Sequence, residues 1–261
     1  MHDTASEPLP LGFRHVDATA PDKIFRCLDC LQALAAGRAY KALALDRLDL
    51  VAGASALDVA CGLGDDVVRM TQRGARAVGV DRSQTLIAAA QSRHAGSGGM
   101  FQVADAAALP FADDSFHAVR IDRALQHILD PGRIVKEMAR VSRRGGVVLC
   151  AEPDWGTFLL GGRHSSVTER IQHDWTRSFQ NPWIGRELAG LLDAAGVGDI
   201  HCETLWLATH GFEESDLVFE IEASAQALST ELPEALPWLE TYRRGEAYAG
   251  VLMLICWGRK P

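Results

Sequence analysis

The stretch from Ala56 to Arg82 (ALDVACGLGDDVVRMTQRGARAVGVDR) most constrains how this chain can fold. An apolar run at 55–60 leads into a turn of small residues, a helical pattern follows, and a second apolar run at 76–80 ends beside Asp81. This order predicts a βαβ unit, in which the turn and the start of the helix face a nucleotide-like ligand.

The same alternation of strands and helices continues along the chain and is typical of an α/β protein with a parallel sheet. Two helical patterns, one starting at Asp22 and one running from Arg38 to about Leu48, precede the first strand. In the first of them Phe25, Leu28, Leu31 and Leu34 recur every three residues. Further helices are predicted at 65–73, 83–93 and 131–142, and further strands at 100–104, 116–122 and 146–152.

The pattern changes after Glu152, where Pro153 and Gly156 are expected to end the strand. A helical insertion at 163–180 is predicted next, followed by a helix at 185–196, a strand at 199–208, helical segments at 213–229 and 233–244, and a strand at 247–257. We therefore expect an N-terminal arm with helices at 1–50 and a core at 51–261. Lid insertions are expected at about 153–183 and 209–246.

Composition excludes several classes of function. With 261 residues, 48% of them hydrophobic, the chain can bury one sizeable core. The net charge of -8 argues against nucleic acid as a partner. The chain has no apolar run of roughly 18 residues and no signal-peptide pattern at its start, which predicts a cytoplasmic protein without a membrane partner.

The six cysteines are scattered, so no disulfide framework is expected. We predict that they are reduced and serve as small core residues. This interpretation includes Cys27 and Cys30, whose spacing is also that of half a redox or metal site. The sequence leaves open whether the protein is a monomer or a homodimer.

The small residues Ala60, Gly62 and Gly64 let the backbone approach a ligand closely. Asp81 lies 17 residues beyond Gly64 and suits a ribose diol, because its two oxygens can accept from both hydroxyls. Asp65 and Asp66 follow the turn directly. Two carboxylates there would repel a pyrophosphate and tolerate a sulfonium, which favours S-adenosylmethionine over NAD. A turn that only packs a helix on a strand is the alternative.

With these features the chain resembles the class I S-adenosylmethionine-dependent methyltransferases, in the ubiquinone-biosynthesis-like group of small-molecule enzymes. The motifs that carry the resemblance are LDVACGLGDD, VGVDRS, ADAAALPFADDSFHAV and RALQHILDPGRIVKEMARVSRRGGVVLCAEPDW. They cover about residues 50–155 closely. The resemblance implies a doubly wound, seven-stranded, mainly parallel sheet of the Rossmann-like type with a reversed final strand.

The resemblance also implies a role for each matching position. Around the methionine part of the cofactor it places Asp58, Ala60, Cys61, Gly62 and Gly64, and at the ribose Asp81. At the adenine it places Arg82, Asp105 and Ala106, and near the methyl group Ile121, Asp122 and Arg123. Two positions depart from the family pattern: Ala60 replaces a glycine, and His117 replaces an aspartate whose structural hydrogen bond is then in doubt.

Methyl transfer mainly requires alignment of the nucleophile with the methyl group and exclusion of water. A weak nucleophile also needs a base, for which His127 is the candidate, with a structural role in its turn as the alternative. Tyr40 and Lys41 are candidates for the cofactor's carboxylate, and His173 and Asp174 for the acceptor. For both pairs a solvated helix face is the alternative.

Asp122, Glu152 and Asp154 lie at strand ends, but they form no obvious ligand set, so no metal is predicted. Six aromatic residues are expected around the insertion, as a lid core or as a wall for an aromatic or polyketide-like acceptor: Trp155, Phe158, Trp175, Phe179, Trp183 and Trp206. The predicted function is methyl transfer from S-adenosylmethionine to an O, N or C centre of a small molecule. The alternatives are a cyclase or decarboxylase that uses the same cofactor, an NAD(P)-dependent oxidoreductase, and a non-catalytic S-adenosylmethionine-binding subunit.

Overall fold

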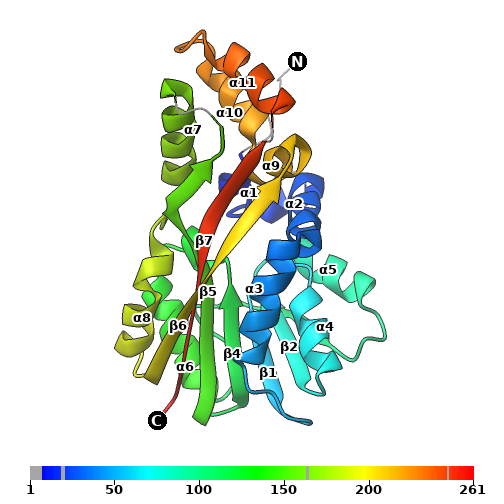
Figure 1. Ribbon diagram of the computed structural model, residues 1–261. Helices are drawn as coiled ribbons and strands as arrows, with labels where there is room; N and C mark the ends of the chain where they lie inside the picture. Colours follow the sequence, from blue (N-terminus) through cyan, green and yellow to red (C-terminus); the bar gives the residue numbers. More distant parts are fainter. Residues whose placement is uncertain (1–7, 19–20, 163–164, 246) are drawn as a thin grey trace.

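The computed structural model describes residues 8–18, 21–162, 165–245 and 247–261, and is built on one seven-stranded sheet (Figure 1). The strands run in the order β3-β2-β1-β4-β5-β7-β6. They are β1 Ser55–Val59, β2 Arg76–Asp81, β3 Met100–Val103, β4 Phe116–Asp122, β5 Ser142–Leu160, β6 Gly198–His210 and β7 Tyr248–Arg259. Only β7 runs against its neighbours. The predicted mainly parallel sheet with a reversed final strand is confirmed.

Helices cover both faces of the sheet. The α-helices are α1 Leu9–Gly12, α2 Pro21–Ala33, α3 Ala35–Asp46, α4 Asp65–Gln72, α5 Gln84–Arg93, α6 Pro131–Val141, α7 Ser166–Arg177, α8 Ile184–Ala194, α9 Phe212–Phe219, α10 Ile221–Leu228 and α11 Ala235–Arg244. Two short 3-10 turns are η1 Val16–Ala18 and η2 Leu125–His127. Figure 1 shows α3, α4 and α5 on one face and α6 and α8 on the other.

The central strands are buried on both sides, so successive residues enter two separate cores. Ala56 and Ala118 pack on the side of α3 and α4, whereas Leu57 and Val119 pack on the side of α6 and α8. Because both faces are covered, these strands read as nearly continuous apolar runs. This explains why the sequence predicts them well.

The expectation that β5 ends before Pro153 is wrong. β5 continues to Leu160 and stays paired with β7 up to the pair Leu160 and Ala249, with a register shift after Asp154. β4 ends opposite Ala151, so β7 is the only strand neighbour of β5 beyond that point in the described part of the chain. A proline is tolerated there, because one side of the strand needs no ladder hydrogen bond.

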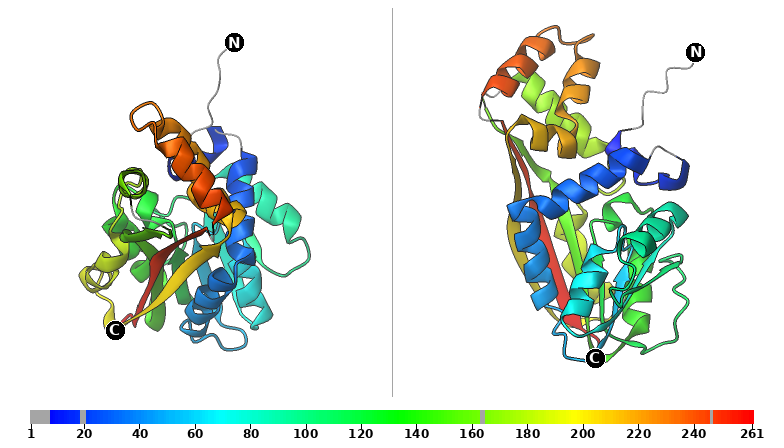
Figure 2. Two further views of the ribbon diagram at one scale, coloured as in Figure 1. Left: turned by 45° about the horizontal axis from the view of Figure 1, so that its top comes forward. Right: turned by 90° about the vertical axis from the view of Figure 1, so that its right-hand side faces the viewer.

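The long strands β5, β6 and β7 carry a helical layer beyond the sheet. In Figures 1 and 2 the helices α7, α9, α10 and α11 lie around the far ends of these strands, and α1 and α2 lie between them and the sheet. Glu220, between α9 and α10, accepts from the Leu9 amide at 2.7 Å and forms an ion pair with Lys23. The N-terminal helices are therefore tied to this layer. No helix in the described ranges is long and apolar enough to cross a membrane.

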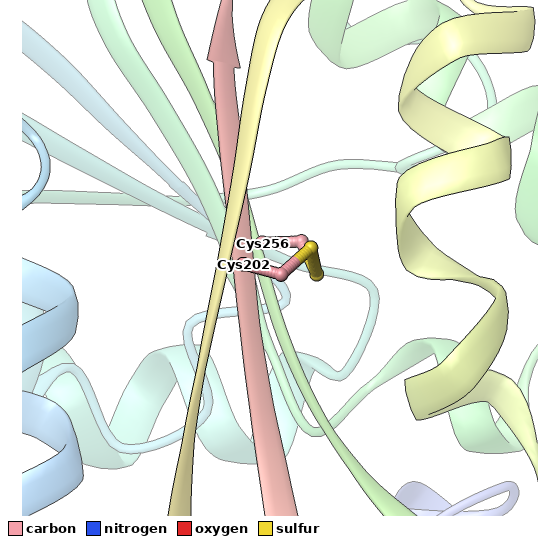
Figure 3. Close-up of a disulfide and its surroundings, with 2 residues drawn as sticks. All are labelled: Cys202 and Cys256. Atoms are coloured by element: carbon pink, nitrogen blue, oxygen red, sulfur yellow. A yellow bond between two sulfur atoms is a disulfide. The ribbon is translucent and has the colours of Figure 1, made fainter.

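One cysteine prediction needs correction. Cys202 and Cys256 form a disulfide between β6 and β7, where they are direct partners with Cα atoms 4.1 Å apart (Figure 3). Their separation of 54 residues hides this pairing in the sequence. Cys27, Cys30, Cys61 and Cys150 are free, and Cys27 and Cys150 are buried as expected of small core residues.

We expect reduction of the Cys202–Cys256 disulfide to destabilise the protein by about 2–4 kcal/mol, since the bond restricts a long loop of the unfolded chain. Urea unfolding with and without reductant measures the difference. The double variant Cys202→Ser/Cys256→Ser is the control and should be insensitive to reductant. Equal stability of the wild type in both conditions would contradict the prediction.

Candidate functional site

The turn after β1 lies beside the end of β2. Gly62 and Gly64 have φ values of 54° and 83°, a left-handed conformation that glycine adopts readily. A Cβ on Gly64 would lie 2.4 Å from the ring of Phe101, so a side chain does not fit there. Ala60 also takes a left-handed φ, of 57°, which strains the backbone of a residue other than glycine slightly. The Gly62 amide donates to Asp81 Oδ2 at 3.1 Å and closes the turn.

A small pocket lies beside this turn. Its walls come from α2, α3, the end of β1, the start of α4 and the end of β4. Residues predicted from the sequence that line it are Asp58, Ala60, Cys61, Gly62, Asp122 and Arg123, and the others are Leu28, Gln32, Lys41, Leu63, Asp65 and Asp66. The tertiary fold therefore gathers the residues expected around the methionine part of a cofactor.

The remaining predicted residues lie outside this pocket. Gly64 is the N-cap of α4, and Asp81 accepts from the amides of Gly62 and Ser83 at the end of β2. Burial raises the pKa of Asp81, although these amides act in the opposite direction. Arg82, Asp105 and Ala106 do not line the pocket. Ile121 was expected near the methyl group, but the structure places its side chain, fully buried, in the core on the α6 side.

The N-terminal segment packs over the end of β2, where the adenine is expected. Asp17 in η1 accepts from Ser83 Oγ at 2.6 Å and from the Thr85 amide at 3.0 Å, at the start of α5. These hydrogen bonds lower the pKa of Asp17 to about 2. The Arg82 guanidinium donates to the Arg14 carbonyl. The described part of the arm thus covers this edge of the sheet.

A buried network of charges forms the floor of the pocket. Arg120, fully buried in the middle of β4, contacts Asp66 Oδ2 at 2.7 Å and Asp122 Oδ2 at 3.0 Å. Lys41 Nζ on α3 lies 2.5 Å from Asp66 Oδ2 and 2.6 Å from Asp122 Oδ2. Asp58 Oδ1 lies 3.5 Å from Arg120. Tyr40 also donates to Asp122, at 3.3 Å. A cluster of this kind is stable only when its charges compensate one another.

The protonation of the network follows from burial and pairing. Burial raises the pKa of Asp58 to about 7, because Arg120 compensates only part of the lost hydration. For Asp66 burial acts in the same direction, but Arg120 and Lys41 together hold its pKa well below the usual range. Burial lowers the pKa of Lys41, but Asp122 and Asp66 outweigh it and raise the pKa. Asp58 is therefore the acid of this set that is most easily protonated.

Two interpretations of the sequence change here. Asp66 presents no free charge to a ligand, since Lys41 and Arg120 neutralise it. Tyr40 and Lys41 are buried in the network and do not lie on a solvated helix face. Sequence reasoning missed Arg120, although a single charge inside the apolar run HAVRID was a usable signal. His117, where the family has aspartate, still accepts a hydrogen bond: its Nδ1 lies 3.1 Å from the Ser55 amide.

His127 in η2 lies between two aromatic rings. The ring centroids of Phe13 and Phe179 lie 5.3 Å and 5.6 Å from that of His127. Burial, together with the positive charges of Arg14, Arg123 and Arg82, lowers the pKa of His127 to about 3. Its Nδ1 is buried and has no hydrogen-bond partner among the described residues. His127 is therefore neutral at pH 7.

The aromatic cluster predicted from the sequence forms only in part. Trp155 stacks on Phe179 with ring centroids 4.3 Å apart, and Phe158, Trp175 and Phe219 pack around this pair. Trp155 and Phe158 lie on β5, Trp175 on α7 and Phe219 on α9, so the cluster joins elements that Figure 1 shows around the far ends of the long strands. The Trp183 side chain is instead 44% exposed. Trp206 on β6 donates to the Tyr248 hydroxyl.

The other polar candidates have separate partners. Asp122 pairs with Lys41 and Arg120, Asp154 with Arg186 at 2.6 Å, and Glu152 Oε1 accepts from the amides of Ala124 and Leu125. Within the described ranges, no three His, Cys, Asp or Glu side chains are arranged to hold a metal. His173 and Asp174 are exposed on α7.

Comparisons with known proteins agree with this geometry. The family model described as "Methyltransferase domain" matches residues 57–150. A ubiquinone/menaquinone biosynthesis C-methyltransferase of Desulfotalea psychrophila is 31% identical over 173 residues, which are 59% of this chain and 70% of the relative. The chain belongs to the S-adenosylmethionine-dependent methyltransferases.

Two further similarities extend over most of this methyltransferase. An uncharacterized 37.1 kDa protein in transposon Tn4556 of Streptomyces fradiae is 30% identical over 254 residues, which are 94% of this chain and 73% of the relative. The crystal structure of a methyltransferase from Bacillus halodurans, named putative, superposes with a TM-score of 0.61 at 20% identity, covering 85% of this chain and 98% of that one. The latter similarity concerns the fold.

Replacing Arg120 by methionine should destabilise the enzyme by about 3–5 kcal/mol, because three buried carboxylates would then share Lys41 as their buried partner. Chemical unfolding at pH 7 measures this. Arg69→Met is the matched control, since Arg69 also pairs with Asp66, at 2.6 Å, but is partly exposed. Loss of the Arg69–Asp66 pair should lower the free energy of unfolding by under about 1 kcal/mol. Similar losses for both variants would show that burial of the pair does not matter.

The low pKa of His127 makes stability depend on pH. The unfolded chain binds a proton near pH 6.5 and the folded chain only near pH 3, so stability is full above 6.5 and falls as the pH drops toward 3. Between pH 7 and pH 5 this difference in pKa lowers the free energy of unfolding by up to about 2 kcal/mol. The free energy of unfolding of the His127→Phe variant, measured by thermal and urea unfolding, should fall by less over that interval. A pH dependence identical to the wild type would contradict a buried neutral His127.

Proposed function

We propose that this methyltransferase transfers the methyl group of S-adenosylmethionine to an O, N or C centre of a small-molecule acceptor. The observation that carries the proposal is the hydrogen bond from the Gly62 amide to Asp81. It joins the glycine turn, which borders the pocket, to the acid at the end of β2. A carboxylate beside a glycine turn at the carboxyl ends of parallel strands is suited to a nucleoside.

The pocket suits a zwitterionic amino-acid end. Its walls carry Asp58, Asp65 and Asp122 for an ammonium group, and Lys41 and Gln32 for a carboxylate. Asp81 would hold the ribose, and Arg82, Asp105 and Ala106 would lie at the adenine, under the N-terminal segment. When bound, S-adenosylmethionine supplies a methyl group that its positive sulfonium has already activated.

The residues of the chain align the acceptor and exclude water. Phe13 from the arm and Phe179 from the helical layer enclose His127, so the acceptor would meet a mostly apolar wall. A pKa of about 3 makes His127 a weak base. We therefore propose that Nδ1 accepts a hydrogen bond from the nucleophilic group of the methyl acceptor. It does not hold that group's proton as a protonated imidazolium would.

The aromatic cluster supports an aromatic or polyketide-like acceptor, because flat apolar molecules pack well on tryptophan and phenylalanine rings. We also propose that the protein is cytoplasmic. Of the alternatives, a cyclase or decarboxylase using the same cofactor has no specific observation in its favour. Membership in the methyltransferase family speaks against an NAD(P)-dependent oxidoreductase.

Calorimetric titration with S-adenosylmethionine and S-adenosylhomocysteine tests the proposal. Asp81→Ala should weaken both by at least about 10-fold, because two charge-assisted hydrogen bonds are lost. Asp113→Ala is the control, since Asp113 is an exposed acid paired with Arg140. Absence of binding to the wild type, or unchanged binding to Asp81→Ala, would count against the site. Turnover without S-adenosylhomocysteine would point to the cyclase or decarboxylase alternative.

A further inference from the structure

Polar atoms without partners collect around His127. Arg14 follows α1, and Arg123 lies in the turn after β4. Arg14 Nε, Arg123 Nε and His127 Nδ1 are all buried, and none has a hydrogen-bond partner in the part of the chain that the structure describes. Buried nitrogens of this kind nearly always have partners in folded proteins. Three such atoms in one region indicate a site for a polar group of a ligand.

These three residues share one location between the arm and the turn after β4. Phe13, the neighbour of Arg14, stacks on the His127 ring. After burial, the positive charges of Arg14 and Arg123 are the largest causes that lower the pKa of His127. Arg123 also has a φ of 53°, and such strain in a residue other than glycine is frequent at ligand sites.

The nearby acids neutralise the two arginines only in part. Asp122 Oδ1 forms a long ion pair with Arg123 Nε, at 3.9 Å, and Asp122 shares its charge with Lys41 and Arg120. Burial raises the pKa of Glu152 to about 8, so this carboxyl is mostly protonated at pH 7. No ion pair forms between Arg14 and any described acid. The region therefore has a surplus of positive charge.

We propose that Arg14 and Arg123 bind an anionic group of the methyl acceptor, a carboxylate or phosphate, while His127 Nδ1 accepts a hydrogen bond from a hydroxyl of the same molecule. The acceptor is then a hydroxy acid with an apolar body against Phe13 and Phe179. Guanidinium groups suit planar oxyanions, and a neutral ring nitrogen suits a hydroxyl. The inference rests on the proposed function, which places the acceptor beside His127.

The same arginines suit a second source of carboxylate, the methionine end of the cofactor. The arrangement favours the acceptor, because Arg14 and His127 do not line the pocket beside the glycine turn, whereas Arg123 does. His127 instead contacts Phe179 of the aromatic cluster. Lys41 and Gln32 are present in the pocket for the cofactor's own carboxylate.

Calorimetry on the full chain saturated with S-adenosylhomocysteine tests this, with 3-hydroxybenzoate and 3-hydroxybenzamide as matched probes. We expect the carboxylate to bind the wild type at least about 10-fold more tightly than the amide, the usual effect of a charge-assisted hydrogen bond. Arg14→Gln and Arg123→Gln should reduce this preference to under about 3-fold. Arg143→Gln, a change at an exposed arginine at the opposite ends of the strands, should keep it.

Affinity for S-adenosylhomocysteine distinguishes the two sources of carboxylate, the methyl acceptor and the cofactor. In both variants the affinity for S-adenosylhomocysteine should change by no more than about 3-fold. If Arg123→Gln weakens S-adenosylhomocysteine but not methylthioadenosine, which lacks the carboxylate, the arginine belongs to the cofactor and the inference is overturned. A wild type without preference for the carboxylate, or a preference that survives both changes, overturns it as well.

The controls keep the result interpretable. Arg14 is partly exposed in a loop, so Arg14→Gln is expected to fold and carries the test if circular dichroism shows that Arg123→Gln does not. If the wild type binds S-adenosylhomocysteine and the arginine variants keep the preference, the inference fails while the proposed function stands. If the wild type does not bind S-adenosylhomocysteine, the proposed function itself fails.

Discussion

The buried contacts of Arg120 and Lys41 with three aspartates are the interaction on which the site depends. A charge removed from water loses several kcal/mol of hydration, which only close opposite charges can restore. In this protein the charges come from α3, β1, α4 and β4, so the pairing fixes these elements relative to one another. The carboxylates are held at defined places along the pocket, and they cannot rearrange without leaving a charge unpaired.

The second organising feature is the length of β5, β6 and β7. Because these strands extend past the end of β4, the sheet has a core half and an outer half. The core half presents the glycine turn and Asp81, and the outer half carries the aromatic cluster. His127 lies where the N-terminal arm, the turn after β4 and this cluster meet. One sheet thus places the glycine turn with its pocket and the aromatic cluster next to each other.

Much of the fold was predictable because it depends on local patterns. Apolar runs that alternate with helical periods identified the strands from β1 to β4 and the helices between them. The prediction failed where tertiary pairing overrides local preference. Pro153 and Gly156 are poor strand residues, yet β7 supports β5 along one side as far as Leu160. Cys202 and Cys256 pair because β6 and β7 align them, which their positions in the chain do not reveal.

The same division holds at the site. The sequence alone determined the βαβ unit, the glycine turn and the place of Asp81 at the end of β2, because apolar runs and small residues at fixed spacing each favour a particular local structure. Only the tertiary structure decided that Asp66 is neutralised, that Ile121 belongs to the core, and that the rings of Phe13 and Phe179 lie against His127. These facts depend on burial and on contacts between distant segments. Charge in a folded protein is set by what surrounds a residue, and the surroundings are assembled only when the chain has folded.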